Sequence, residues 1–305
     1  MTPIIRACGL TKRFGEFTAV DHLDLEVMPG QVFAFLGANG SGKSTTIRML
    51  IGLLRPTAGE VEVDGINVIQ RPRKVRDHIG YMGQKVSLYS GLSLRENVEF
   101  YAGLYDLSAA ELEERWGALR ERFSLGDAER EKIEDLPGGI RQRAGLALST
   151  IHQPRVLFLD EPTAGVDVHN RGLFWDLIAD EAAAGVTVFV TTHFLEEVDY
   201  CDWASFIHAG RLIANAAPET LRRQFSDGYR VAVRLPAATR AAARERLAAF
   251  GGVADTADGL LLSAPALGAD LLGAVEALGA ESVHIDPPQM TDIFRRLLTE
   301  SEAAA

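Results

Sequence analysis

At 305 residues the chain is longer than one average domain, and the usual size of about 150 residues per domain predicts two domains. Apolar residues make up 47% and charged residues 24%, which is ordinary for a globular protein and excludes a disordered or fibrous chain. The 31 basic and 42 acidic side chains leave a net charge of -11, which argues against general binding to a nucleic-acid backbone, because that binding depends on a broad positive field.

Cysteine content and apolar runs bear on where the protein works. Cys8 and Cys201 form no CxxC motif and no disulfide framework, which indicates a reducing compartment. The first residues lack the pattern of a secretory signal, and no stretch approaches the roughly 18 apolar residues of a transmembrane helix. We therefore expect a soluble, cytoplasmic protein.

Up to about residue 225 the sequence alternates short β-branched runs with helical stretches, as α/β proteins do. Residues 32–36, 156–159 and 187–190 are apolar runs of the kind that form strands buried on both faces of a parallel sheet. Ligands of such sheets bind beyond the carboxyl ends of the strands. The residues that follow these three runs are therefore the first candidates for chemistry.

Residues 92–135 have the pattern of a helical insert. Ser93 with Glu96, and Ser108 with Glu111, fit capping boxes that begin helices. Positions 112, 116, 119 and 123 carry large apolar side chains at helical spacing. This stripe predicts a packed face of a helix rather than a cofactor contact.

The first apolar run is followed by GANGSGKST, a full match to the phosphate-loop pattern GxxxxGK[ST]. Its glycines let successive backbone N–H groups form a concave anion-binding loop, and the helix that begins near Lys43 directs its positive end at the phosphates. Lys43 can reach the β- and γ-phosphates of a nucleotide, and the Ser44 hydroxyl can bind Mg²⁺. The predicted phosphate-binding residues are Asn39, Gly40, Ser41, Gly42, Lys43, Ser44 and Thr45.

The second apolar run ends in two adjacent carboxylates, Asp160 and Glu161. Adjacent carboxylates at a phosphate site would repel each other unless they had separate tasks. We predict that Asp160 holds Mg²⁺, directly or through water, and that Glu161 orients and deprotonates the attacking water. A solvated acidic turn is the alternative, but the apolar run immediately before the pair disfavours it.

The third apolar run leads to Thr191, Thr192 and His193. At the end of a buried strand, His193 could donate a hydrogen bond to the γ-phosphate, or it could have a structural role, as histidines often do. The other six histidines show no metal-ligand spacing, so no zinc or iron site is predicted.

From residue 226 to residue 305 the sequence becomes rich in Ala, Leu and Arg, and we predict a separate, small α+β accessory domain. Its expected strands are residues 229–235, 260–263 and 282–285, and its expected helices are residues 237–250, 267–278 and 291–298. The segment contains no cluster of catalytic residue types. Packing and regulation both remain open as its role.

The ordered motifs together carry a family resemblance. In chain order they are Phe14-Gly15, the phosphate loop, Gln84 after a strand, LPGGIRQR at 136–143, the Asp160–Glu161 pair, a loop ending in Asp167, and His193. Residues 4–225 resemble the ATP-binding subunit of ABC transporters, and the runs at 82–105 and 160–167 are most similar to bacterial drug exporters. The resemblance implies an α/β phosphate-loop NTPase of the ABC ATPase type in residues 1–225. It would have a mixed sheet core and a helical insert at about 92–145, followed by the small α+β domain.

The family implies roles for the matched residues. Phe14 would stack on adenine, with a core aromatic as the alternative. Gln84 would contact Mg²⁺ or the lytic water and sense the membrane partner. Gly138 and Gly139 would close on the ATP of a second subunit, and Asp167 would communicate across the dimer.

The resemblance also implies what the whole protein does. We expect an ATPase that uses ATP and Mg²⁺, forms a head-to-tail dimer with a second ATPase subunit, and powers a separate transmembrane permease. The protein would lie at the inner face of the cell membrane through that permease. The exporter subgroup implies export of drugs or other hydrophobic compounds.

The chain departs from the usual LSGGQ signature of the family, because Pro137 replaces serine and Ile140 replaces glutamine. Proline has neither the hydroxyl that would reach the γ-phosphate of the partner's nucleotide nor a backbone N–H. One such hydrogen bond contributes about 1.5–3 kcal/mol. Gly138 and Gly139 still offer N–H groups at the start of a helix, and a proline-containing form occurs in the exporter subgroup, so we favour a working but altered ATPase. The alternative is an ATP-gated dimeric clamp or regulator with weak hydrolysis.

The basic run RPRKVR at 71–76 raises the possibility of nucleic-acid binding. It has no interleaved aromatic residues, and the whole chain is acidic, so a solvated basic face is favoured. The motif spacing leaves no room for the coiled coils or zinc modules of DNA-repair relatives, and the chain carries one ATPase copy rather than two. We therefore expect no nucleic-acid partner.

Overall fold

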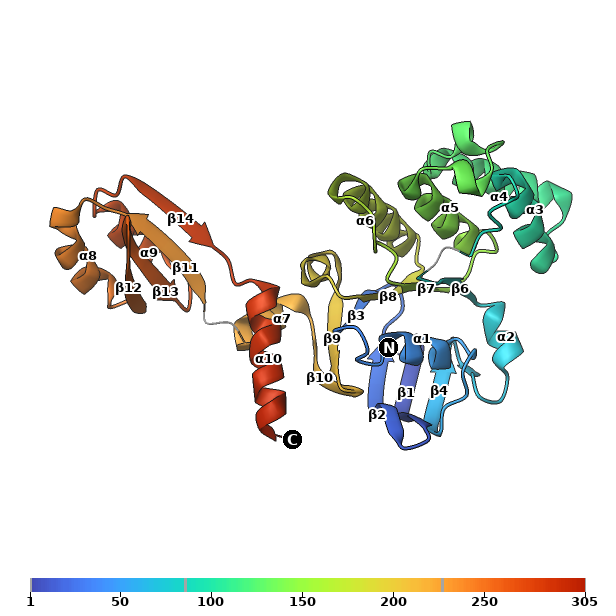
Figure 1. Ribbon diagram of the computed structural model, residues 1–305, viewed down its shortest axis with the longest axis horizontal. Coiled ribbons are helices and arrows are strands. Elements are labelled where there is room, and N and C mark those ends of the chain that lie inside the picture. Colours follow the sequence, from blue (N-terminus) through green and yellow to red (C-terminus); the bar gives the residue numbers. More distant parts are fainter. Residues whose placement is uncertain (1, 85–86, 226–227, 305) are drawn as a thin grey trace. The chain divides into compact units, whose positions relative to one another are not determined.

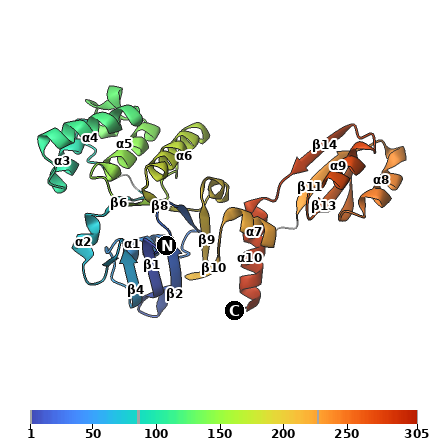
Figure 2. The ribbon, with the colours of Figure 1, turned by 180° about the vertical axis from the view of Figure 1, so that it is seen from behind.

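The computed structural model of the chain, shown from two sides in Figures 1 and 2, describes residues 2–84, 87–225 and 228–304. The chain forms two compact units, residues 1–216 and 217–305. The sequence predicted a boundary near residue 225, whereas the structure groups helix α7 (Pro218–Phe225) with the second unit. The reason is that α7 packs against α10 (Met290–Ala304) and buries Leu221.

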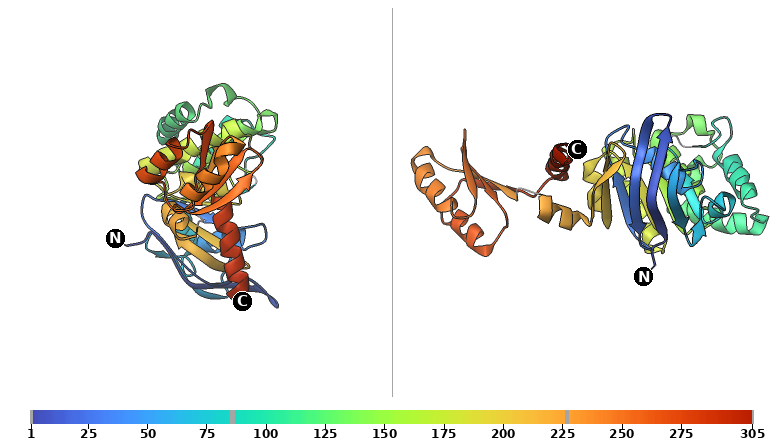
Figure 3. Two further views of the ribbon diagram at one scale, coloured as in Figure 1. Left: turned by 90° about the vertical axis from the view of Figure 1, so that its left-hand side faces the viewer. Right: turned by 90° about the horizontal axis from the view of Figure 1, so that it is seen from below.

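The first unit begins with an antiparallel sheet whose strand order is β2-β1-β4-β5. Its strands are β1 (Ile5–Phe14), β2 (Phe17–Val27), β4 (Ala58–Val63) and β5 (Ile66–Asn67). The long strands β1 and β2 form a hairpin in which Phe14 pairs with Phe17, and they run side by side in dark blue in the right-hand view of Figure 3. Alternating buried and exposed residues along β2 show that one face of the sheet packs on a core.

The second sheet of the first unit is mixed, with the order β10-β9-β3-β8-β7-β6. Its strands are β3 (Val32–Leu36), β6 (Ile79–Met82), β7 (Val156–Asp160), β8 (Thr187–Thr192), β9 (Trp203–His208) and β10 (Arg211–Ala216). All neighbours are parallel except β10, which is antiparallel to β9. Every residue of β3, β7 and β8 is buried, as the continuous apolar runs predicted.

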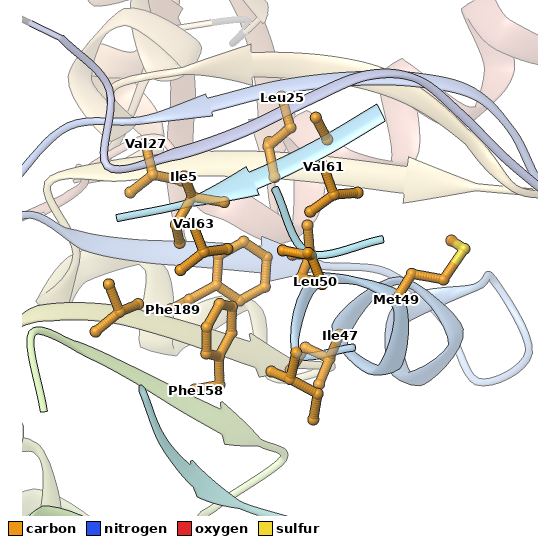
Figure 4. Close-up of a cluster of buried hydrophobic side chains, with 14 of the residues drawn as sticks. Ile5, Leu25, Val27, Ile47, Met49, Leu50, Val61, Val63, Phe158 and Phe189 are labelled. Atoms are coloured by element: carbon orange, nitrogen blue, oxygen red, sulfur yellow. The ribbon is translucent and has the colours of Figure 1, made fainter. Parts of the chain in front are cut away.

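The main apolar core lies between the two sheets, as Figure 4 shows. The antiparallel sheet contributes Ile5, Leu25, Val27, Val61 and Val63, the mixed sheet contributes Phe158 and Phe189, and helix α1 (Lys43–Leu50) contributes Ile47, Met49 and Leu50. This packing holds β3 and α1 in place, and with them the loop that joins the two.

Helices cover the other side of the mixed sheet and form the insert (Figure 1). In chain order the remaining helical elements of this unit are α2 (Pro72–Arg76), α3 (Leu94–Leu104), α4 (Ala109–Arg122), η1 (Gly126–Ala128), η2 (Ile133–Asp135), α5 (Gly138–Thr150), α6 (Val168–Ala183) and η3 (Leu195–Tyr200). Both predicted capping boxes are confirmed, at the starts of α3 and α4. Of the predicted apolar stripe, Leu112, Trp116 and Phe123 are buried.

The second unit is built on a four-stranded antiparallel sheet with the order β12-β13-β11-β14. After α7 its elements are β11 (Tyr229–Arg234), η4 (Ala237–Thr239), α8 (Arg240–Leu247), β12 (Gly252–Thr256), β13 (Gly259–Ala264), α9 (Ala269–Glu276), β14 (Ser282–Asp286) and α10. This is the β-α-β-β-α-β arrangement of a ferredoxin-like fold. Apolar side chains of α8 and α9 pack on one face of the sheet.

Within the described part of the chain, every helix is too short or too polar to serve as a transmembrane span.

Candidate functional site

The phosphate loop joins β3 to α1 and passes close to neighbouring backbone. A Cβ atom on Gly37 would collide with the Ile207 carbonyl, and one on Gly42 would lie 2.6 Å from the Ala19 carbonyl. Gly42 also has φ of 113°, a left-handed conformation that glycine adopts without strain, and it directly precedes α1. The loop therefore needs glycine at these positions for steric reasons.

Lys43 is the first residue of α1 and is only 4% exposed. Its ammonium donates to the carbonyls of Gly37 (2.7 Å) and Ala38 (3.2 Å), so the lysine side chain folds back over the loop. Its third polar neighbour is Glu161, whose Oε1 lies 3.2 Å from Nζ. The positive charge is therefore held at the loop, where an anion bound by the backbone N–H groups would meet it.

The other predicted residues of the loop differ in exposure. Asn39 and Gly40 lie exposed at its tip, and Thr45 is partly buried in the first turn of α1. Ser41 is buried, and its hydroxyl has no hydrogen-bond partner among the described residues. A buried hydroxyl without a partner is free to donate to a bound phosphate oxygen, which fits the prediction that this loop binds phosphate.

Asp160 ends β7 beside the start of α1. Its Oδ1 accepts hydrogen bonds from the hydroxyls of Ser44 (3.2 Å) and Thr191 (2.7 Å). A carboxylate next to a hydroxyl provides the hard oxygen ligands that Mg²⁺ prefers. Burial raises the pKa of the Tyr81 hydroxyl, and the nearby charge of Asp160 raises it further.

Glu161 is the meeting point of the candidate residues. Its carboxylate is in contact with Lys43 through Oε1, and with Gln84 Nε2 (3.3 Å) and His193 Nδ1 (3.2 Å) through Oε2. These groups follow four adjacent strands of the mixed sheet, β3, β8, β7 and β6. The structure thus brings Lys43, Gln84, Glu161 and His193 to one place, at the carboxyl edge of the sheet.

Phe14 lies at the tip of the β1–β2 hairpin, 51% exposed, with the Lys12 ammonium 5.1 Å from its ring centre. Phe14 is therefore not packed in the apolar core. The same hairpin runs back toward the phosphate loop, because Ala19 of β2 abuts Gly42.

Gly138 and Gly139 open helix α5 and are not joined to the group around Glu161 by the hydrogen bonds of the described residues. Pro137 is the N-cap of that helix, with φ -55° and ψ 147°, and gives no side-chain cap. Gly139 lies against the side chain of Asn170, since an added Cβ would be 2.9 Å from it. Asp167 caps α6 by accepting from the Asn170 N–H at 3.1 Å.

Sequence reasoning assigned no role to two residues that shape this site. The Thr191 hydroxyl donates to Asp160 and accepts from the Glu161 N–H at 3.0 Å, so it links the two carboxylate residues. The Gln142 amide of α5 donates to the Pro162 carbonyl. Gln142 lies within the LPGGIRQR motif, which gave it no separate role, and no motif marks Thr191. The signal for Thr191 is its pairing with Asp160 in the β7–β8 register.

The chain is similar to known proteins in both sequence and structure. The family model for ABC transporters matches residues 20–164. The probable multidrug ABC transporter ATP-binding protein YbhF of Escherichia coli (strain K12) is 44% identical over 224 residues, which cover 73% of this chain and 39% of that protein. The daunorubicin resistance ATP-binding protein DrrA3 of Streptomyces coeruleorubidus is 40% identical over 297 residues, which cover 95% of this chain and 94% of that protein. The matched region thus covers well under half the length of YbhF.

Solved structures match the same architecture. An ATP-binding subunit of an ABC transporter is similar at a TM-score of 0.67 and 28% identity, over 73% of this chain and 93% of that chain. The ATP-binding cassette MJ0796, solved as a dimer in a post-hydrolysis state bound to ADP and Pi, is similar at a TM-score of 0.64 and 25% identity, over 70% of this chain and 98% of that chain.

Proposed function

Because this chain belongs to the ABC transporter family as one of its ATP-binding subunits, we propose that it hydrolyses ATP to power a separate membrane permease. The observation that carries the proposal is the convergence of Lys43, Gln84 and His193 on the Glu161 carboxylate, each within 3.3 Å. A base, a cation and two polar groups at one sheet edge are what phosphoryl transfer to water requires.

Each of these side chains has a task in the proposed reaction. Glu161 accepts a proton from the attacking water, and Gln84 and His193 hold the carboxylate and that water in line with the γ-phosphate. Lys43 and the N–H groups of the loop, with the Ser41 hydroxyl, bind the phosphates. Phe14 stacks on the adenine from the exposed hairpin tip.

Mg²⁺ would be held by Ser44 and Asp160, whose oxygens lie 3.2 Å apart, with Gln84 as a further ligand. The chemistry that the cation supplies when bound is neutralisation of charge on the phosphates. The Thr191 hydroxyl keeps Asp160 oriented toward Ser44 because it donates to the same carboxylate.

A second copy of the ATPase subunit would complete each site in a head-to-tail dimer. In this arrangement Gly138 and Gly139 offer backbone N–H groups at the start of α5 to the nucleotide of the partner. Asp167 would face the partner from the start of α6. The placement of both at helix starts, exposed or partly exposed, supports this proposal.

The permease would dock on an aromatic patch formed by Tyr89 and Phe100. These residues are 50% and 40% exposed, and their rings meet edge to face at 4.7 Å. Exposed apolar groups that cluster on a soluble surface mark interaction sites. Tyr89 follows Gln84 closely in the chain, so binding of the permease at the patch would affect the position of Gln84 at the catalytic edge.

The names of the relatives support a substrate class. YbhF is called a probable multidrug protein, and DrrA3 is called a daunorubicin resistance protein. We propose that the permease exports drugs or other hydrophobic compounds, and that this subunit lies at the inner face of the cell membrane through it.

Glu161→Gln tests the proposed hydrolysis in the full-length protein. The amide keeps the shape of the side chain but cannot accept the proton, so kcat should fall by about 100-fold or more while ATP still binds. Glu181→Gln is the matched control, because Glu181 is also a buried glutamate, 5% exposed, but lies near the end of α6 beside Arg122. Turnover that is equal in wild type and Glu161→Gln would overturn the proposal and favour the clamp or regulator.

The docking patch is tested by co-purification with the membrane protein that the wild-type chain retains from its own cells. The double variant Tyr89→Ser/Phe100→Ser should lose the permease while keeping its ATP affinity. Leu53→Ser is the control, because Leu53 is 55% exposed and lies just after α1. Retention of the permease by the double variant would rule the patch out.

A further inference from the structure

One buried acid of the first unit has no part in the site described so far. Glu197, in η3, is 1% exposed. Its Oε1 accepts a hydrogen bond from the Thr163 hydroxyl at 2.5 Å and lies 3.8 Å from Arg171 Nε, whereas Oε2 has no hydrogen-bond partner among the described residues. A buried carboxylate with so little compensation opposes folding, because it has lost its hydration. Its presence therefore calls for a reason other than stability.

The partners of the Glu197 carboxylate come from two segments that carry candidate residues, and one of them leads on to a third. Thr163 lies two positions after Glu161, in the loop that follows β7. Arg171 lies one helical turn after Asp167, in α6. The Arg171 guanidinium also stacks over the Phe194 ring at 4.1 Å, and that ring lies 4.1 Å from the His193 ring.

The loop after β7 starts in a conformation that needs support. Glu161 has φ of 51°, in the left-handed region that residues other than glycine rarely adopt. Such a backbone persists only when its surroundings hold it. Upstream, the Glu161 N–H is held by the carbonyl and hydroxyl of Thr191. Downstream, the hydrogen bond between Thr163 and Glu197 is positioned to hold the other end of this strained segment.

We propose that Glu197 is a positioning residue for ATP hydrolysis. By binding Thr163, and by holding Arg171 over Phe194, it keeps the Glu161 carboxylate and the His193 ring in their relative places. It touches neither nucleotide nor water and acts through its partners. The inference rests on the proposed ATPase function and adds to it a determinant of the catalytic geometry that lies behind the site.

Thr163→Val is the sharpest test, because it removes the hydroxyl and keeps the shape. In the full-length protein kcat for ATP should fall by about 10- to 100-fold, since small misplacements of a catalytic group have effects of that size. KM and the ATP affinity should stay within about twofold of wild type, because the phosphate loop is unchanged. Thr163→Ser restores the hydroxyl and should restore kcat.

Thr187→Val is the matched control for loss of a buried hydroxyl. Thr187 is 0% exposed, begins β8 at the end away from His193, and its hydroxyl accepts from the Gly30 N–H at 2.9 Å. Both valine variants should lower the melting temperature, but Thr187→Val should keep the wild-type kcat. A kcat loss that is the same in the two variants would show a general structural effect and overturn the proposal.

The double variant Thr163→Val/Glu197→Gln shows whether the two residues act through one shared contact or independently of each other. If both substitutions break the same positioning contact, the double variant should lose no more kcat than the worse single variant. Fully multiplicative losses would overturn the proposal, as would a Thr163→Val protein with wild-type kcat. Wild-type turnover that is lost in Glu161→Gln supports the proposed function by itself, so a normal Thr163→Val would then overturn only the role of Glu197. A wild type without turnover would overturn both.

Discussion

The catalytic edge of the first unit and the sheet of the second unit place their charged residues differently. In the first, Lys43, Asp160 and Glu161 are 4%, 3% and 6% exposed. In the second, ion pairs lie at the surface, such as Arg244 with Asp255, whose side chains are 48% and 64% exposed. Every buried residue described between 217 and 305 is apolar.

The difference in the burial of charged side chains indicates different roles for the two sheets. Burying charge costs free energy, so buried charged groups concentrate where chemistry needs them. The second unit is held together by its apolar cluster between the sheet and the helices α8 and α9, and its charges are solvated. The difference therefore assigns phosphate chemistry to the first unit and leaves the second unit with packing or regulation.

The largest difference between the two regions is expected in ATP affinity, when Lys43→Ala is compared with Arg244→Ala. In Lys43→Ala we expect the affinity for ATP to fall by about 100-fold, because hydrogen bonds to charged groups contribute about 1.5–3 kcal/mol each. Arg244→Ala removes an exposed ion pair, which is worth about 0–1 kcal/mol to folding, and should leave ATP affinity unchanged. Titration calorimetry of the full chain measures both. Similar losses in the two variants would break the contrast.

The sequence was most informative where chemistry and local structure coincide. The apolar run 32–36 matches β3 residue for residue, because a strand buried on both faces excludes polar side chains. The candidate residues after β3, β6, β7 and β8 meet because parallel strands share one carboxyl edge. Strand β12 was missed, since GVADT is an exposed edge strand in which Val253 packs on the cluster and the other residues are exposed.

The residues that support the site could not be predicted in the same way. Thr191 depends on the register that pairs it with Asp160, and Glu197 reaches Thr163 across 34 positions of sequence. Neither pairing has a local pattern, because each arises from the packing of elements that are distant in the chain. Residue type alone made Glu197 indistinguishable from the exposed Glu196 beside it.

An effect of intermediate size is expected from a comparison of two prolines, one in each unit, that have nearly the same backbone conformation. Pro137 caps α5 with φ -55° and ψ 147°, and Pro236 caps η4 of the second unit with φ -56° and ψ 143°. Pro137→Ser supplies a hydroxyl at the proposed dimer contact, so ATP-dependent dimerisation in a Glu161→Gln background should strengthen about tenfold. Pro236→Ser should change nothing. Sedimentation with and without ATP measures both, and an equal gain in the two variants would remove Pro137 from the nucleotide contact.

The smallest effect is expected from a comparison of two histidines, one with a partly buried ring and one with an exposed ring. Burial lowers the pKa of His152, which stacks on Tyr105 at 3.7 Å and whose Nε2 lies 2.9 Å from the Ile79 carbonyl. Arg115 lowers this pKa further, whereas the Ile79 contact and Asp77 oppose the shift. His284 in the second unit is 77% exposed.

Since the unfolded chain binds the His152 proton more readily than the folded chain, the stability from neutral His152 is present above pH of about 6.5 and is lost below it. His152→Gln should therefore flatten the fall of the unfolding free energy on acidification from about pH 7.5 to 5.5, by at most about 1.4 kcal/mol per pH unit. His284→Gln is the control for the loss of an exposed histidine, and its effect on the slope should be smaller than that of His152→Gln. Denaturant unfolding at a series of pH values measures the slopes. If His152→Gln showed the same dependence of unfolding free energy on pH as the wild type, the prediction would be wrong. The site between Tyr105 and Ile79 would then accommodate a protonated imidazole without loss of stability.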